Sequence, residues 1–450
     1  MSLVSICRRA KLTLLNMRIL LLHPSFFPDP SPASRLFTEL AVDLAESGHE
    51  VEVLTGTAED GSSALFLSSV RMRRLYCGAC QPDKRWSCRI GYARFLFSAG
   101  WRIFFQRQPD LLLVPSPPPL LMLLAYMLHR LRGTHYIAWA LEVELTLLQP
   151  VTGNIVRRFW RKRRIRLIQT ALRHARRIVT CSEDLRAGLR GALAPFPDSL
   201  DLLPIWADGR QLAPIRAEHN VIIRGLDLEG KFILTGFYEN LGAEGLELLA
   251  RAGRQLTDAE QPHHVIVGRQ PLVRARKPKP APPVPGQIDW IAPVSLAREG
   301  HLYSSASLGL LQITEAETHI RFPFALPRFL AAGTPILLLG SEQGAVSRFL
   351  RTHGCGWTIP AGNDAVLAER LRLLRQSPEI LAAARRNARR AFEASFERKH
   401  GAARWRRLLE SEACVQAHST ENTHPSTLGR FQPERLAVQN DSAAPLRTSA

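Results

Sequence analysis

The pattern of apolar and polar positions over residues 17–55 predicts a strand, a loop, a helix and a second strand. Ile19–Leu22 is an all-apolar run, typical of a strand buried on both faces. After a turn-rich loop, leucines recur at helical spacing from Leu36 to Leu44, and Gly48 ends this helix before the apolar positions of Val51–Leu54. This order is a βαβ unit, and ligands of doubly wound folds bind at the carboxyl end of such a first strand. A core βαβ unit of another α/β protein has the same periodicity.

Similar patterns recur along the chain and indicate more than one α/β unit. Short apolar runs predict further strands, and two long amphipathic stretches near the C-terminus predict helices. Either Asn363 or Asp364 is expected to cap the first of these helices. The predicted strands are 111–114, 136–140, 178–181, 232–235 and 265–267, and the predicted helices are 365–374 and 379–392.

Length and charge limit the classes of protein. At 450 residues the chain is too long for one ordinary domain, and its formal charge of +19 with a pI near 10.5 favours anionic partners. The most basic stretch is 156–178, where arginines and lysines surround Phe159 and Trp160. This stretch predicts either docking on anionic lipid headgroups or a plain solvated helix. We expect no nucleic-acid partner, because no binding fold or base-stacking motif accompanies the charge.

Cysteine spacing and the most apolar windows argue against a metal site and a membrane span. Cys77, Cys80 and Cys88 form the one cluster among seven cysteines, and no second pair of ligands follows, so we expect a reduced loop and no metal. Residues 1–16 lack the apolar core of a signal peptide, and the natural start is either Met1 or Met17. Prolines interrupt the window 111–131, which favours a strand, a turn and a helix.

Several motifs together resemble one family. In the first half they are His23-Pro24, Phe26-Phe27-Pro28, Arg35-Leu36 and Gly48-His49-Glu50-Val51, and in the second half Pro323–Pro335. These residues resemble the GT-B retaining glycosyltransferases of family 4 type, which include O-antigen, capsule and colanic-acid enzymes. The resemblance covers roughly residues 17–409.

The resemblance implies an α/β fold of the GT-B type, with two Rossmann-like doubly wound domains facing across a cleft. The implied organisation is an N-terminal extension (1–16), an acceptor domain (17–200), a linker (201–230), a nucleotide-sugar domain (231–392), a helix that crosses back to the first domain (393–411) and a disordered tail (412–450).

The resemblance also implies the residues of the donor site. They are Asn240 and Gly242 after the first strand of the second domain, Gly268 and Arg269 after the next strand, and Arg328 and Gly333 in the Pro323–Pro335 segment. Three departures weaken the match: Glu239 replaces a glycine, Ala325 a lysine, and Arg328 the glutamate that holds the ribose. A guanidinium can only donate hydrogen bonds, so Arg328 binds phosphate or no donor at all.

On the acceptor side, the resemblance implies Glu142 as the carboxylate that orients or deprotonates a hydroxyl group. Glu144 is the alternative, because the register is not fixed, and a surface glutamate beside a strand is the plainer interpretation. The implied acceptor loop contributes Phe27, Ser31, Ser34 and Arg35. Prolines 28, 30 and 32 leave this loop fewer backbone donors for a phosphate.

By resemblance, we expect sugar transfer from a nucleotide-sugar donor to a glycan or polyprenyl-linked acceptor, with retention, in cell-envelope polysaccharide synthesis. No cofactor or metal is expected. The expected location is cytoplasmic, peripheral on the inner face of the plasma membrane at an anionic membrane surface. The departures at Glu239, Ala325 and Arg328 support an alternative: a non-catalytic, glycosyltransferase-like binding or scaffold protein.

Overall fold

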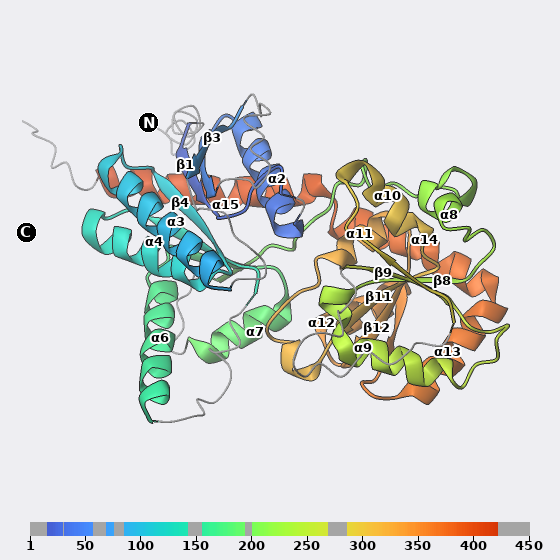
Figure 1. Cartoon of the computed structure of the whole chain (residues 1–450). Coiled ribbons are helices and arrows are strands. Elements are labelled where there is room, and N and C mark those ends of the chain that lie inside the picture. The colour runs from blue at the N-terminus through green and yellow to red at the C-terminus, as the bar shows by residue number, and fades with distance from the viewer. Residues whose placement is uncertain are drawn as a thin grey trace, which may run out of the picture.

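The computed structural model describes residues 16–29, 31–56, 69–75, 85–142, 155–193, 200–268 and 286–421. Within these residues, two parallel β-sheets form the cores of two lobes that lie side by side (Figure 1). The first sheet has the strand order β3-β2-β1-β4-β5-β6-β7, and the second has the order β10-β9-β8-β11-β12-β13. Both orders are those of doubly wound sheets, as the sequence predicts.

The first lobe is built from residues before 203. Its strands are β1 (Arg18–Leu22), β2 (Glu50–Gly56), β3 (Arg71–Leu75), β4 (Leu111–Ser116), β5 (Tyr136–Ala140), β6 (Arg177–Thr180) and β7 (Leu200–Leu202). Its helices are α2 (Pro32–Glu46), α3 (Arg85–Phe105), α4 (Pro119–Arg132), α6 (Ile155–Arg173) and α7 (Glu183–Ala192).

The second lobe follows a linker that contains η1 (Ala217–His219) and α8 (Val221–Gly225). Its strands are β8 (Ile233–Phe237), β9 (His263–Val267), β10 (Ile288–Ile291), β11 (Leu308–Ile313), β12 (Ile336–Gly340) and β13 (Gly356–Ile359). Its helices are α9 (Tyr238–Gly253), α10 (Leu296–Ser305), η2 (Glu315–Glu317), α11 (Ala325–Ala331), α12 (Ala345–His353), α13 (Asp364–Gln376) and α14 (Pro378–Ser395). The final helix, α15 (Arg398–Glu421), packs against α2 of the first lobe.

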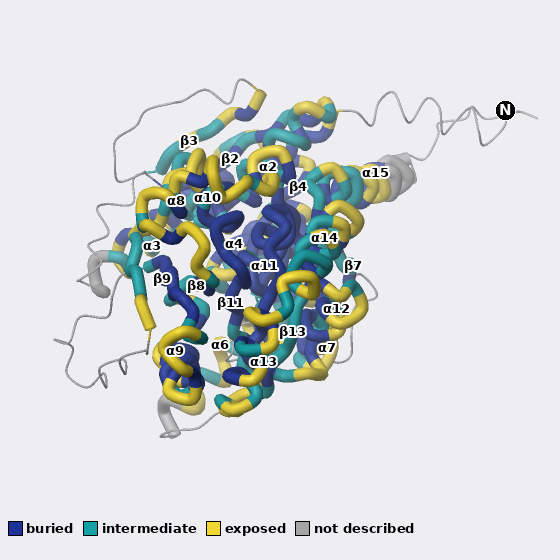
Figure 2. Tube along the Cα trace, turned by 90° about the vertical axis from the view of Figure 1, so that its right-hand side faces the viewer, coloured by how far each residue is buried: buried dark blue, intermediate teal, exposed yellow. Residues whose placement is uncertain are grey.

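The central strands are apolar because helices cover both faces of each sheet. In the first sheet Leu21 pairs with Val53 on one side and Leu113 on the other, and all three side chains are buried. In the second lobe every residue of α11 is buried, and Figure 2 shows this helix at the centre of the molecule.

Local signals set several helix ends. Ser31 caps α2, with its Oγ accepting a hydrogen bond from the Ser34 amide at 3.3 Å, and Pro32 occupies the first turn. Asn363 rather than Asp364 caps α13, since its side chain accepts from the Val366 amide. Both caps keep the start of a helix in place next to a loop.

The last helix returns to the first lobe. In Figure 1, α15 leaves α14 in the second lobe and runs along the first lobe, where Arg398 pairs with Asp43 of α2 at 2.7 Å. Trp405 is fully buried, with its ring 4.8 Å from that of Trp139 on β5 and at a steep angle to it. Trp206 of the linker stacks on Trp139 at 5.9 Å. These three tryptophans join a strand, the linker and the final helix in one core.

Two features differ from the sequence expectation. Helix α15 continues to Glu421, past residue 412 where a disordered tail was expected to begin. Cys88 is disulfide-bonded, so the expectation of a reduced loop around it is wrong. Cys77 and Cys80 lie outside the described residues.

No described helix is both long enough and apolar enough to cross a membrane. Within the described residues, no cluster of three or more histidine, cysteine or acidic side chains could hold a metal ion.

Candidate functional site

A cavity of about 350 Å³ lies between the lobes and draws residues from both. The first lobe contributes the start of α2 and the residue that follows β5. The second lobe contributes the ends of β8 and β11, the start of α9, α10 and the segment that leads into α11. The lining residues are Ser31, Pro32, Ala33, Glu142, Phe237, Glu239, Asn240, Tyr303, Gln312, Ile313, Arg321, Phe322, Pro323, Phe324 and Ala325. Carboxyl ends of parallel strands from both sheets thus meet here, where doubly wound folds bind ligands.

Glu142 is the acidic residue of the first lobe that reaches this cavity. Its backbone forms an antiparallel bridge with Arg321, so the two lobes touch directly beside it. Burial raises the pKa of Glu142 above its ordinary value, the nearby Glu317 adds to this effect, and Arg321 opposes it. Glu144, the alternative carboxylate, lies outside the described residues.

Arg321 is the cationic residue among those that line the cavity. Its guanidinium lies 3.1 Å from the Glu317 carboxylate, which also accepts a hydrogen bond from the Thr314 amide. Arg321 was not among the residues predicted from the sequence, because its position on an irregular segment gives no periodic signal.

The start of α9 is shaped by a glycine. Gly242 has φ 58° and ψ −167°, which breaks the helix after its first turn. No atom lies within 4 Å of a Cβ built at Gly242, so the requirement there is conformational and not spatial. The break separates the first turn, with Glu239 and Asn240 on the cavity, from the body of α9. Asn240 is thereby brought to the same cavity as Glu142.

Gln312 is a cavity residue that the sequence analysis missed. It lies near the carboxyl end of β11, and its Oε1 is a buried acceptor without a hydrogen-bond partner among the described residues. A signal was present: Gln312 is the polar residue of an otherwise apolar strand, Leu308–Ile313, at the end where ligands bind. An unpaired buried acceptor favours a ligand that donates hydrogen bonds, such as a sugar hydroxyl group.

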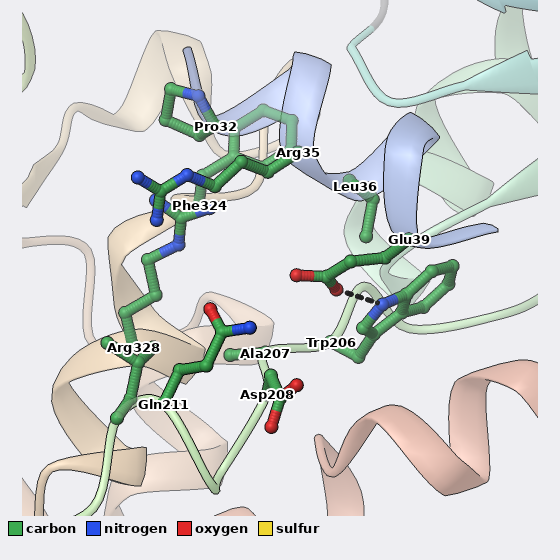
Figure 3. Close-up of a pocket in the computed structure, with 11 residues that line it drawn as sticks. Pro32, Arg35, Leu36, Glu39, Trp206, Ala207, Asp208, Gln211, Phe324 and Arg328 are labelled. Atoms are coloured by element: carbon green, nitrogen blue, oxygen red, sulfur yellow. Dashed lines mark hydrogen bonds between the residues drawn. The ribbon is translucent and has the colours of Figure 1, made fainter. Parts of the chain in front are cut away.

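The structure places Arg328 beside the domain interface and not among the residues that line the cavity. Arg328 is 8% exposed, and its Nη1 lies 3.8 Å from Glu299 Oε1. The same glutamate pairs with Arg35 of α2, so one carboxylate joins two cations from different lobes. Figure 3 shows the guanidinium groups of Arg35 and Arg328 next to each other. We call Arg35, Glu299 and Arg328 the interlobe triad.

Two further groups surround the interlobe triad. Burial raises the pKa of Tyr303 to about 12, and Arg328, which also shares a hydrogen bond with it, pulls the other way. Glu39 accepts a hydrogen bond from Trp206 Nε1 at 2.8 Å (Figure 3), and burial raises its pKa while Arg398 and Arg328 lower it. A substitution at Arg328 therefore acts on the packing between the lobes before it acts on any ligand.

The remaining predicted site residues have structural surroundings. Gly268 ends β9 with φ 140°, and a Cβ there would lie 3.1 Å from Tyr238 Cβ. Gly333 follows α11 with φ 69° and does not line the cavity. Ser34 is fully buried, and Phe27 packs against the core of the first lobe. Arg269 and Pro30 lie outside the described residues. Of the four residues predicted for the acceptor loop (Phe27, Ser31, Ser34 and Arg35), Ser31 is the one that lines the cavity.

Comparisons with known proteins agree with this architecture. Residues 33–206 match the family model described as a glycosyl transferase 4-like domain. No curated protein sequence matches the chain. A sucrose-phosphate synthase from Thermosynechococcus elongatus superimposes with a TM-score of 0.68 at 15% identity, over 88% of this chain and 99% of that one. The chain has the GT-B fold.

Two other structures share the GT-B fold. Anabaena HepE in complex with UDP has a TM-score of 0.64 at 11% identity, over 88% of this chain and 100% of that one. WaaG, a glycosyltransferase involved in lipopolysaccharide biosynthesis, has a TM-score of 0.58 at 16% identity, over 83% of this chain and 95% of that one. At these identities the likeness concerns the fold, so the activity of this GT-B protein has to be argued from its own residues.

Proposed function

We propose that the protein is a glycosyltransferase that moves a sugar from a nucleotide-sugar donor to a glycan or lipid-linked acceptor. The observation that carries the proposal is the interlobe cavity, which unites Glu142 of the first lobe with Asn240 and Gln312 of the second. The glycosyl transferase 4-like domain over residues 33–206 and the UDP and UDP-glucose complexes of Anabaena HepE support it. Retention, a role in envelope polysaccharide synthesis and a cytoplasmic location at the inner face of the plasma membrane complete the proposal.

Four groups at the cavity have roles in this chemistry. Glu142, in its ionised form, orients the acceptor hydroxyl or takes its proton. The amide of Asn240 and the unpaired Oε1 of Gln312 hold sugar hydroxyls. The first turn of α9 borders the cavity, and its backbone N–H groups donate hydrogen bonds to the donor phosphates. No metal or cofactor is needed in this scheme.

One observation favours a second candidate, a glycosyltransferase-like binding protein without activity. Arg321 is the single cation among the described lining residues, and Glu317 already pairs with it. Glu239 adds a negative charge on the α9 side, where the donor phosphates would lie. A cavity with this charge pattern holds a diphosphate less tightly than one lined by unpaired cations.

Calorimetry with UDP, GDP, ADP, CMP and several of their sugars, on the full chain, separates the two candidates. We expect saturable binding of one nucleoside diphosphate and its sugar, weakened about tenfold or more in Asn240→Ala because an amide that contacts the donor is lost. Leu296→Ala, an exposed position outside the cavity, is the matched control. A folded protein that binds none of these nucleotides would refute donor-dependent transfer and establish the binding-protein candidate.

The raised pKa of Glu142 predicts the acid limb of the activity profile. The active form is the carboxylate, so activity is present above the pKa of Glu142 and is lost as the pH falls through it. Because burial raises this pKa, kcat/KM should begin to fall at a higher pH than an ordinary carboxyl group would give. The measurement is kcat/KM against pH, with circular dichroism at each pH as the control for folding. A flat profile down to the ordinary carboxyl range would contradict a catalytic Glu142.

A further inference from the structure

Exposed apolar side chains gather on three helices of the first lobe. Most of the large hydrophobic side chains exposed among the described residues belong to α3, α4 or α6, and the others are scattered singly over the linker and the second lobe. We call this set the outer helical face. Its apolar members are Ile90, Phe97, Trp101, Phe104, Phe105, Leu120, Met127, Leu131, Phe159, Trp160 and Leu167. Soluble domains rarely expose so many large apolar side chains on neighbouring elements without a partner.

The topology places the three helices in one layer. They follow β3, β4 and β5, and each of these connections moves the chain in the same direction along the sheet. Right-handed crossovers then put all three helices on the same side. Helix α4 packs against both α3 and α6, and Figure 1 shows the three on the side of the first lobe that is turned away from the second lobe. The face is therefore continuous and leaves the interlobe cavity free.

Helix α3 carries an aromatic ridge along this face. Phe97, Trp101 and Phe105 recur every four residues, and their side chains are 72%, 61% and 65% exposed. Their ring centroids are 6.1 and 4.5 Å apart along the ridge. The opposite side of the helix, with Phe95, is buried in the core of the lobe. The helix is thus apolar on two sides, of which the protein itself covers one.

The charges of the outer helical face have one sign. None of the three helices contains an aspartate or a glutamate. Basic side chains flank the apolar ones on each helix, most densely on α6 around Phe159 and Trp160. Exposed cations of the face are Arg89, Arg94, Arg130, Arg158, Lys162, Arg163, Arg164 and Arg166. Aromatic side chains among cations, with no acidic neighbours, match the boundary between anionic headgroups and acyl chains.

We propose that the outer helical face docks on an anionic lipid bilayer. In this arrangement the aromatic ridge of α3 enters the boundary between headgroups and acyl chains, and the cations of α6 lie against the headgroups. The proposal gives a specific surface to the peripheral location proposed above, but it does not depend on glycosyl transfer. A nucleic acid fits less well, because the ridge rings stack on one another or lie at a tilt, with interplanar angles of 28° and 47°, and so leave fewer ring faces free for bases.

Vesicle co-sedimentation of the full chain tests the proposal. The vesicles contain phosphatidylcholine alone or an equal mixture with phosphatidylglycerol. We expect strong binding to the anionic vesicles only, at least tenfold weaker in the ridge variant Phe97→Ser/Trp101→Ser/Phe105→Ser. The cation variant Arg158→Ser/Lys162→Ser/Arg163→Ser/Arg166→Ser should bind roughly six hundredfold less, since each of the four basic residues near an anionic surface contributes about a fivefold factor. The control Val221→Ser/Leu296→Ser/Leu373→Ser replaces exposed apolar side chains of the linker and the second lobe and should bind normally.

Depth of insertion gives a second readout. Brominated lipids should quench tryptophan fluorescence in the wild type, and Trp101→Phe should lose much of this quenching while it still binds. Because the ridge is exposed, the ridge variant should keep its thermal unfolding midpoint, which excludes misfolding as the cause of lost binding. Nucleotide binding measured in the same variants is expected to stay unchanged, so failure here is distinct from failure of the proposed function.

Three outcomes would overturn the proposal. The first is a wild-type protein that does not bind anionic vesicles, or a ridge variant that binds them as well as the wild type. The second is binding of single-stranded RNA that excess vesicles do not displace and that the ridge variant loses, which would assign the face to nucleic acid. The third is a wild-type protein that forms a dimer and does not bind lipid, together with a ridge variant that is monomeric. This result would assign the face to a second copy of the chain.

Discussion

Replacing Glu142 with glutamine is expected to lower kcat by roughly 10²- to 10⁴-fold, the usual loss when a general base is removed. Glutamine keeps the shape and can still accept a hydrogen bond, but it cannot take a proton. Donor affinity should change little, because the donor contacts proposed here come from the second lobe. The measurement is release of nucleoside diphosphate from the donor found by calorimetry, with kcat and KM determined separately.

Two variants sharpen this test. Glu183→Gln changes an exposed carboxylate of the same lobe that pairs with Arg186 on its own helix, and its kcat should be that of the wild type. Glu144→Gln addresses the alternative register left open by the sequence. Unchanged turnover in Glu142→Gln together with a large loss in Glu144→Gln would transfer the role to Glu144. Unchanged turnover in both would remove the acidic segment from the mechanism.

Removing Glu299 is expected to destabilise the protein by about 3 to 5 kcal/mol, the usual cost of leaving buried charges without their partner. Glu299 is 7% exposed and neutralises Arg35 and Arg328, whose side chains are 13% and 10% exposed. In Glu299→Ala the neighbouring guanidinium groups of Arg35 and Arg328 (Figure 3) lose the carboxylate that they share. Denaturant unfolding measures the loss.

Two further variants separate the effect of unpaired charge from the effect of lost packing. Glu218→Ala removes an exposed carboxylate from a surface ion pair with Arg216 and should change stability by less than about 0.5 kcal/mol. The triple variant Arg35→Met/Glu299→Met/Arg328→Met replaces the whole interlobe triad by apolar side chains of similar length and should recover most of the stability. A triple variant as unstable as Glu299→Ala would show that packing, and not unpaired charge, accounts for the loss.

Sequence patterns predicted the fold because the sheets are buried on both faces. A strand such as β5 (Tyr136–Ala140) must then be apolar throughout, and the predicted and observed bounds of this strand agree. Polar residues at the carboxyl ends of such strands also indicate where a ligand binds. Glu142 after β5 and Asn240 after β8 were expected at the site from the family resemblance, and both line the interlobe cavity.

The parts that sequence could not predict depend on distant partners. Arg328 looked like a ligand-binding residue because its partner, Glu299, belongs to another helix, and the second partner of that glutamate, Arg35, is 264 residues away from it. Neither pairing has a local pattern. The aromatic ridge of α3 was missed for the opposite reason: a helix that is apolar on two opposite sides gives no sign in its sequence of which side is covered, and only the fold reveals that Phe97 and Trp101 face outward.

The return of α15 has a consequence for the order in which the chain folds during synthesis. Trp405 fills the core of the first lobe beside Trp139, yet 266 residues separate them, and the whole second lobe is translated in between. A nascent chain normally completes its N-terminal domain first. Here the core of the first lobe stays incomplete until α15, the last described helix, has left the ribosome. The second lobe can therefore complete its core before the first lobe does. The first lobe expressed without α15 should be prone to aggregation.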